Sequence, residues 1–200
     1  MIDLNKLDLT EKPLTEFKAF YNKAVELNQR SIEASCLSTI DIKKKSAHSR
    51  YVNIKYINSQ EFIFFTNYES KKAKEIKTSS KVALNFYWNM ANVQIRIEGN
   101  ISKINESISD EHFKTRGDAK NALAISSQQS QCIDSYKNVQ INYQSQLGIL
   151  SSLSKRPAYW GGYSITPYYF EFWEGHESRL NKRSVYEKNL DSWNHYYLQP

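Results

Sequence analysis

A chain of 200 residues is long enough for one domain with a sizeable hydrophobic core. Its composition, 40% hydrophobic and 24% charged, is that of an ordinary globular protein, and no apolar run approaches membrane-spanning length, so we expect no membrane segment. The formal net charge of +6 favours anionic ligands, but it is mild for a dedicated nucleic-acid binder, and we expect no nucleic-acid partner.

The remaining composition bears on the interior and on the compartment. The 14 tyrosines and 9 phenylalanines favour a β-rich interior. Cys36 and Cys132 have no metal-ligand spacing, so we expect no metal site. Two scattered cysteines and a charged N-terminal stretch without an apolar signal region indicate a reduced, cytoplasmic environment.

In chain order, the first expected feature is a tail over residues 1–12, either mobile or docked on a partner, followed by a single domain over residues 13–200. Pro13 suits the first turn of a helix. Apolar residues then recur at spacings of three and four as far as Leu27, which predicts an amphipathic helix.

The next part of the chain is expected to be mostly strands. Strand character is found in residues 33–40, 51–57, 61–66, 81–88 and 93–104. Along the last of these, apolar and polar residues alternate with period two, which is typical of a half-buried antiparallel strand. The lysines at 43–45 predict a solvated hairpin turn, and Lys71 and Lys72 open a short basic helix.

The second half is expected to contain helices and then further strands. Helices are predicted at residues 110–116, 120–126 and 136–150, and strands at 168–173, 183–187 and 193–198. Trp160-Gly161-Gly162 is expected to form a tight turn. Because strands outnumber helices and come as hairpins, a mainly β (α+β) fold is expected, with a closed antiparallel barrel and peripheral helices.

A cationic set is the first candidate for chemistry. It comprises Arg50, Lys55, Lys71 and Lys72. Such groups hold phosphates through charge-assisted hydrogen bonds, although a solvated basic face is the more common role of exposed lysines. Arg50 and Lys55 are separated by an odd number of positions, so a regular strand would point them to opposite faces.

Two further candidates could bind a flat ring. The carboxamide of Gln94 can donate to and accept from a heteroaromatic edge, or it can simply face solvent. Trp173, Arg179 and Arg183 could stack on a ring and hold a negative group, or be one core tryptophan with two surface arginines. Because no nucleophile or dinucleotide motif is present, an enzyme of this sequence would take its reactivity from a bound cofactor.

Several segments stand in an order that supports a more specific interpretation. They are Arg50-Tyr-Val-Asn-Ile-Lys55, Phe64-Phe-Thr-Asn-Tyr-Glu-Ser-Lys-Lys72, Val93-Gln-Ile-Arg-Ile-Glu-Gly99, Gln129-Ser130, Trp160-Gly-Gly-Tyr163, and Glu171-Phe-Trp173 with Arg179 and Arg183. Together they resemble the pyridoxine/pyridoxamine 5′-phosphate oxidase family over nearly the whole chain. The resemblance implies an FMN-binding split β-barrel homodimer, with FMN between the subunits. It also implies oxidation of pyridoxamine or pyridoxine 5′-phosphate to pyridoxal 5′-phosphate, with O2 as acceptor.

The resemblance also implies residue roles by position. FMN would be contacted by Arg50, Lys55, Phe65, Thr66, Lys71, Lys72, Gln94, Gln129, Ser130, Trp173 and Arg183. The phosphorylated small-molecule substrate would be contacted by Lys55, His112, Arg116, Lys120 and Arg179, and the catalytic positions would be Arg179 and Asn181.

Four positions depart from the family's usual residues. His112 replaces a tyrosine, Lys120 a serine, Asn181 a histidine and Lys71 an arginine. Asn181 cannot titrate, so any acid–base role of the usual histidine is lost. Two alternatives therefore stay open. One is a related flavin oxidase of the phenazine-biosynthesis type, and the other is a flavin- or pyridoxal-phosphate-binding protein without turnover.

Overall fold

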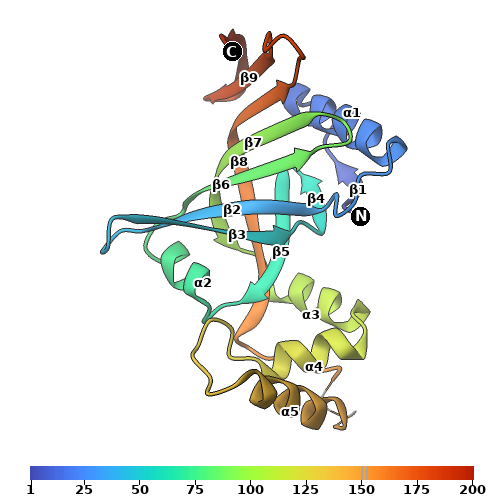
Figure 1. Cartoon of the computed structure of the whole chain (residues 1–200), viewed down its shortest axis with the longest axis vertical. Coiled ribbons are helices and arrows are strands. Elements are labelled where there is room, and N and C mark those ends of the chain that lie inside the picture. Colours follow the sequence, from blue (N-terminus) through green and yellow to red (C-terminus); the bar gives the residue numbers. More distant parts are fainter. Residues whose placement is uncertain (150, 152) are drawn as a thin grey trace.

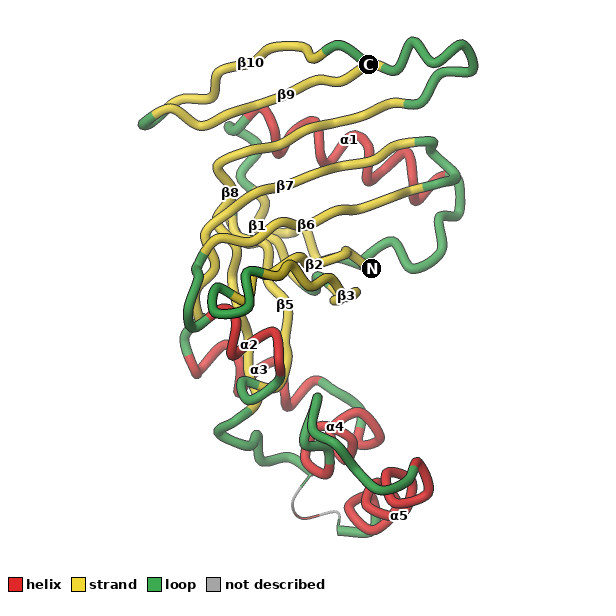
Figure 2. Tube along the Cα trace, turned by 60° about the vertical axis from the view of Figure 1, so that its left-hand side comes forward, coloured by secondary structure: helices red, strands yellow, loops and turns green. Residues whose placement is uncertain are grey.

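The structure, a computed structural model, describes residues 1–149, 151 and 153–200. In this described part a ten-stranded sheet curls around a core and is accompanied by five helices (Figures 1 and 2). The strands are β1 (Asp3–Leu7), β2 (Ala34–Asp41), β3 (Ser46–Asn53), β4 (Tyr56–Ser59), β5 (Glu61–Asn67), β6 (Lys81–Trp88), β7 (Val93–Lys103), β8 (Trp160–Glu174), β9 (Lys182–Asn189) and β10 (Ser192–Leu198). The helices are α1 (Lys12–Glu26), α2 (Lys71–Ile76), α3 (Glu106–Thr115), α4 (Asp118–Ser126) and α5 (Tyr136–Leu147).

The sheet is a split barrel. Its strand order is β1-β4-β5-β8-β7-β6-β2-β3, with β9 and β10 added beside β8. All pairs are antiparallel except β1 with β4, and the pairing does not close the ends of this order. The mainly β split-barrel class is therefore confirmed, while the expectation of a closed barrel was wrong.

The reason for the split lies at Ile54 and Lys55. The Ile54 N–H donates to the carbonyl of Glu33, before β2, whereas the next N–H, that of Lys55, donates to the carbonyl of Ile63 on β5. The chain thus passes from the β2 side of the barrel to the β5 side within two residues. This crossing also divides the single strand predicted for residues 51–57 into β3 and β4.

Two other expectations are corrected by the structure. Residues 3–7 are not a free tail but form β1, and Ile2 beside them is 5% exposed with its N–H bonded to the Tyr21 hydroxyl. Gly161 and Gly162 do not make a tight turn; they begin β8, opposite Thr66 and Phe65. Their lack of a side chain serves close packing, since a Cβ on Gly161 would lie 2.3 Å from the Tyr68 hydroxyl.

The core lies between the curled sheet and α1. Leu14, Phe17, Tyr21 and Ala24 are buried on one face of α1, as the three-and-four spacing predicts. The Phe17 ring packs edge-on against Phe62 of β5, with centroids 5.2 Å apart. The predicted alternation of β7 is also confirmed, because its buried and more exposed residues alternate.

Helices α3, α4 and α5 form a separate layer at the opposite end of the molecule from the β9–β10 hairpin, as both views show (Figures 1 and 2). The three predicted helices are confirmed with shifted boundaries. Helix α3 begins at Glu106 because the Asn105 side chain accepts a bond from the Ser107 N–H. Residue 150, the predicted end of the third helix, lies outside the described residues.

No helix in the described part of the chain is long and apolar enough to cross a membrane.

Gly99 offers a test of the packing between β7 and β8. A Cβ there would lie 2.6 Å from Ile165 Cγ2 and 2.8 Å from the Thr166 carbonyl oxygen, at a register shift between the two strands. We expect Gly99→Ala to lower the free energy of unfolding by about 1–3 kcal/mol through overpacking. Urea denaturation measures this change.

Gly148→Ala is the control, because its added Cβ would meet nothing closer than 3.5 Å. It should change stability by less than about 0.5 kcal/mol. Equal stability of the Gly99 and Gly148 variants would contradict the packing described here.

Candidate cofactor and substrate site

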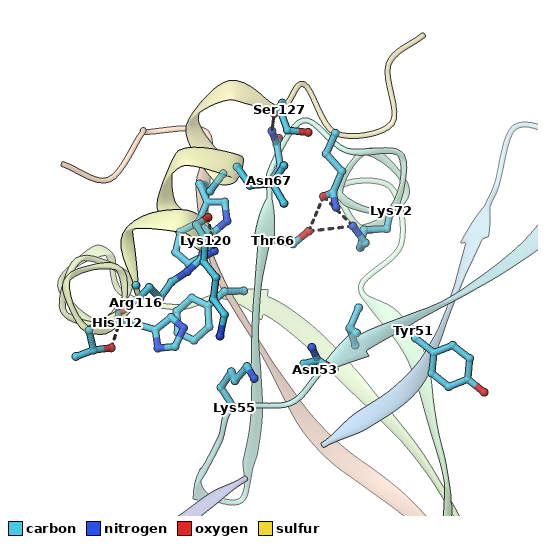
Figure 3. A pocket seen from close by; sticks show the side chains of 18 residues that line it. Tyr51, Asn53, Lys55, Thr66, Asn67, Lys72, His112, Arg116, Lys120 and Ser127 are labelled. Carbon is cyan, nitrogen blue, oxygen red and sulfur yellow. Dashed lines mark hydrogen bonds between the residues drawn. The ribbon is translucent and has the colours of Figure 1, made fainter. Parts of the chain in front are cut away.

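A cavity of about 580 Å3 opens where β5 and the start of β8 meet α3 and α4 (Figure 3). Its lining contains four cationic side chains, Lys55, Lys72, Arg116 and Lys120. Among the residues that line it there is no aspartate or glutamate. Clustered positive charge in a concave site is suited to an anionic ligand.

Lys72 lies at one end of the cavity and is held only by neutral acceptors. Lys72 lies on the buried side of α2, and the residue is 7% exposed. The ammonium lies 2.9 Å from Thr66 Oγ1, 3.1 Å from Gln129 Oε1 and 3.3 Å from Ser70 Oγ. Burial, followed by the nearby charge of Arg50, lowers the pKa of Lys72 to about 8. Because this buried ammonium has no carboxylate partner in the chain, it can form an ion pair with a bound anion.

A wall of aromatic rings forms the other end. The Phe65 ring stacks on His112 with centroids 3.8 Å apart and on Trp160 with centroids 5.5 Å apart. His112 Nδ1 lies 2.7 Å from the Tyr56 hydroxyl. Burial, then the charges of Arg116 and its neighbours, lower the pKa of His112 to about 4, so this imidazole is neutral at pH 7.

The remaining cations surround this wall. Arg116 lies over the Trp160 ring, with its Cζ 4.4 Å from the centroid, and donates to the Lys120 carbonyl at 2.8 Å. Lys55 has a distant carboxylate, Glu33, at 3.9 Å. Figure 3 shows His112, Arg116 and Lys120 on one side of the cavity and Lys72 with Thr66 on the other. The cavity thus offers two separate places for negative charge.

Arg50 does not line this cavity. Its guanidinium donates to Glu75 Oε2 at 3.1 Å and also to Thr39 and the Leu37 carbonyl. Glu75 Oε1 lies 2.8 Å from His48 Nδ1 as well. Burial alone would raise the pKa of Glu75, but the Thr39 hydroxyl, which donates to Glu75 Oε2, and then Arg50 and His48 lower it, so the carboxylate is ionised.

A second group of the predicted residues lies at the far end of β8. Gln94 of β7 stands opposite Trp173 of β8, which stands opposite Arg183 of β9. Because Trp160 borders the cavity, Trp173 stands up to roughly 40 Å from it along the extended strand. The structure thus brings the ring-binding candidates into one row, but not into the cavity.

The other predicted positions lie outside both places. Lys71 is exposed beside Lys72, and Ser130 is exposed and borders a neighbouring hollow of about 390 Å3. Arg179 and Asn181 occupy the connection from β8 to β9, where Arg179 is exposed with a φ of 63°. Asn181 Oδ1 accepts a bond from the His176 N–H at 3.0 Å.

Sequence reasoning did not select several residues of the cavity. Those with polar or aromatic side chains are Tyr51, Asn53, Asn67, Thr115, Ser127 and Trp160. Tyr51, Asn53, Asn67 and Trp160 stand inside segments that carry the family resemblance, and Thr115 and Ser127 lie one or two positions from a predicted residue; these are the signals that could have found them. Glu75 gave no signal, because its partner Arg50 is distant in sequence.

The fold and the cavity define the class as a split-barrel protein with a polycationic cavity suited to an anionic ligand. Two family descriptions match the sequence: "Pyridoxamine 5′-phosphate oxidase" over residues 18–145 and "Pyridoxine 5′-phosphate oxidase C-terminal dimerisation region" over residues 160–200. The chain belongs to the pyridoxamine 5′-phosphate oxidase family, a family of oxidoreductases, as the resemblance predicted. The second match indicates a homodimer.

Curated relatives agree over almost their full length. Pyridoxine/pyridoxamine 5′-phosphate oxidase of Cytophaga hutchinsonii is 37% identical over 98% of this chain and 93% of its own. Pyridoxine/pyridoxamine 5′-phosphate oxidase 1 of Hydrogenovibrio crunogenus is 36% identical over 98% of this chain and 92% of its own.

Solved structures share the fold. PhzG from Burkholderia lata 383, in complex with tetrahydrophenazine-1-carboxylic acid, superposes with a TM-score of 0.90 at 26% identity, covering 95% of this chain and 93% of its own. A pyridoxamine 5′-phosphate oxidase-related, FMN-binding protein from Nostoc punctiforme has a TM-score of 0.74 at 14% identity, covering 92% and 97%. The family and this fold point to a flavin cofactor.

The lowered pKa of Lys72 predicts a pH dependence of stability. Between pH 8 and 10.5 the unfolded chain holds this proton and the folded chain does not, so the group makes the free energy of unfolding rise with pH in that window. We expect Lys72→Met to lose this rise, roughly 1–3 kcal/mol, in urea denaturation at pH 7.5 and 10.

Lys74→Met provides the control, because Lys74 is exposed on the same helix. Its pH dependence should match that of the unsubstituted protein. The same pH dependence in the Lys72 variant would contradict the burial of an ammonium at this place.

Proposed function

We propose that the protein is an FMN-dependent oxidase that converts pyridoxamine or pyridoxine 5′-phosphate to pyridoxal 5′-phosphate, with O2 as acceptor. The observation that carries the proposal is the cavity with four cations and no carboxylate among its lining residues. Its two separate cationic places match two phosphate-bearing molecules, the cofactor and the substrate. Membership of the oxidase family supplies the reaction class.

The residues at the Lys72 end fit the phosphate of FMN. Lys72 supplies charge, and the Thr66 hydroxyl and the Gln129 carboxamide, now bonded to the ammonium, can also donate to phosphate oxygens. Phosphate binding would hold the Lys72 proton in place, because a nearby negative charge raises the pKa of an ammonium. In this proposal Lys55, Phe65 and Lys71 border the same cofactor.

The residues at the aromatic end fit the phosphorylated substrate. Arg116 is oriented by its contacts with Trp160 and the Lys120 carbonyl, and its other N–H groups remain for a phosphate. Lys120 adds charge where the family usually has an uncharged serine. Neutral His112 can donate from one ring nitrogen while the other bonds Tyr56.

FMN held in this cavity would supply the redox chemistry, which is acceptance of a hydride from the substrate carbon that bears the amine or alcohol and reduction of O2 to hydrogen peroxide. The amine or alcohol group would lose a proton, and water would hydrolyse the imine formed from an amine to the aldehyde and ammonia. The chain's own part is to hold both molecules in a fixed relation and to supply charge. Arg179 and Asn181 are proposed to meet the substrate, with Asn181 giving hydrogen bonds but no proton transfer.

A homodimer is needed to complete this site. Gln94, Trp173 and Arg183 lie at the far end of β8, and none of them lines the cavity that contains Lys72. We propose that this row of a second copy closes over the FMN held at Lys72. A cytoplasmic location is part of the same proposal, since Cys36 and Cys132 are not bonded to each other.

A different substrate is the second candidate. PhzG, seen with a phenazine-type ligand, superposes on the chain with a TM-score of 0.90. The unusual residues His112 and Lys120 both lie in the aromatic end of the cavity, where they would select the substrate. The flavin half of the proposal is the same for both candidates.

Flavin binding and turnover test the proposal directly. Purified protein should bind FMN, quench its fluorescence and form the aldehyde from pyridoxamine 5′-phosphate, measured by absorbance. A panel of amines and reduced aromatics separates the two substrate classes. Protein that neither carries nor takes up FMN would refute the proposal, and FMN binding without peroxide from any substrate would identify a binding protein.

The Asn181 position predicts a specific pH effect. We expect Asn181→His to give kcat/KM a new titration near pH 6.5, the ordinary pKa of histidine, with an effect of at least about tenfold. Asn189→His, an exposed change at the end of β9, should leave the profile unaltered. Matching profiles of the two variants would show that position 181 does not reach the substrate.

A further inference from the structure

Glu171 has the most heavily bonded carboxylate at the β7–β8–β9 end of the sheet. The residue is 2% exposed although it lies on the face opposite the core residues Phe170 and Phe172. It accepts hydrogen bonds from Arg96 Nη1 at 2.7 Å, from Arg183 Nε at 2.8 Å and from the Tyr169 hydroxyl at 3.0 Å. Arg183 Nη2 forms an ion pair with it at 2.7 Å. One carboxylate thus binds two guanidinium groups, those of Arg96 and Arg183.

These bonds fix the Arg183 side chain. Its Nε and Nη2 are held by Glu171 Oε1, and its Nη1 donates to the Gln199 carbonyl at 3.0 Å. A guanidinium has five N–H donors, so two donors and the flat face stay available. Trp173 stands beside Arg183 across the strand pair, with Gln94 on its other side.

We infer that Glu171 is a positioning residue, which holds Arg183 in the orientation that it presents to FMN. The inference rests on the proposed function and assigns a role to a residue outside the predicted contacts. Without the carboxylate, Arg183 would have to lose its rotamer freedom on binding, and it would stand unscreened near Arg96. With the carboxylate, the guanidinium is ordered before the cofactor arrives.

A purely structural role explains the cluster less well. A buried ion pair often adds no net stability over well-packed apolar residues, because both charges lose their hydration. The core side of β8 is already filled by Phe170 and Phe172, which are fully buried. What the cluster provides is a fixed direction for two arginines on the opposite face.

The test is a double-mutant cycle on FMN affinity, measured by flavin fluorescence quenching with the full chain. Glu171→Gln should weaken FMN binding at least about tenfold. Arg183→Gln should weaken it similarly, and the double variant should lose no more than Arg183→Gln alone, since Glu171 acts through Arg183. Losses of the two single variants that add in the double variant, or an unchanged affinity of Glu171→Gln, would overturn the inference.

Two further variants separate positioning from folding. Glu174→Gln is the matched control, because Glu174 lies on the same strand and bonds Lys182 at 2.9 Å; its FMN affinity should be unchanged. Glu171→Asp keeps the charge and shortens the side chain by one methylene. It should fold normally, as judged by circular dichroism, and bind FMN with intermediate affinity. Full affinity in this variant would count against positioning.

A measurement on the cofactor-free protein distinguishes the proposed function from the positioning role of Glu171. The Arg183 Nε–H proton should exchange slowly with water in NMR spectra of the cofactor-free protein, and fast in Glu171→Gln. Slow exchange with no FMN binding would refute the proposed function while keeping the ordered arginine. Fast exchange in the unsubstituted protein would refute the ordered arginine itself.

Discussion

The length of β8 is the constraint on which the arrangement of the molecule depends. Its first half pairs with β5 and brings Trp160 to the cavity, whereas its second half pairs with β9 and carries Glu171 and Trp173. Strand β7 pairs with β8 from Tyr163 to Glu174 and so joins the two halves. Residues that the family resemblance assigns to one cofactor are thereby held at opposite ends of one strand. The proposed cofactor site is therefore one that a second copy of the chain completes, and the matched dimerisation region agrees with this proposal.

The two kinds of cation are treated differently by the fold. Arg50 and Arg183 are each paired with a buried carboxylate, Glu75 and Glu171, so their guanidinium groups are ordered. Lys72, in contrast, is buried among neutral acceptors. Arginine with its planar fork suits fixed hydrogen bonding, whereas an unpaired lysine keeps its full charge for a phosphate.

Local patterns predicted much of the fold. The period-two alternation of β7 and the three-and-four spacing of α1 are direct consequences of burying one face, so both were predicted correctly. Gly161 and Gly162 were misread because glycine marks tight turns and close packing alike, and only the neighbouring Tyr68 distinguishes the two. The open barrel was missed because the crossing at Ile54 and Lys55 depends on bonds to distant strands.

The site was less predictable from local patterns. The residue roles came from the resemblance, and they remain proposals. The odd separation of Arg50 and Lys55 predicted that the two side chains could not face one ligand from a regular strand. It could not show that Arg50 turns to Glu75, or that Lys72 is buried, since both depend on how α2 packs against the sheet.

The shared site is tested most directly by mixing two damaged subunits. Lys72→Gln and Arg183→Gln each remove one end of the proposed site, so neither homodimer should bind FMN tightly. In a mixed dimer, the intact Lys72 of one subunit meets the intact Arg183 of the other, and FMN should bind at half the normal stoichiometry. Failure of the mixed dimer to regain any tight FMN binding would contradict a cofactor site built from two copies of the chain.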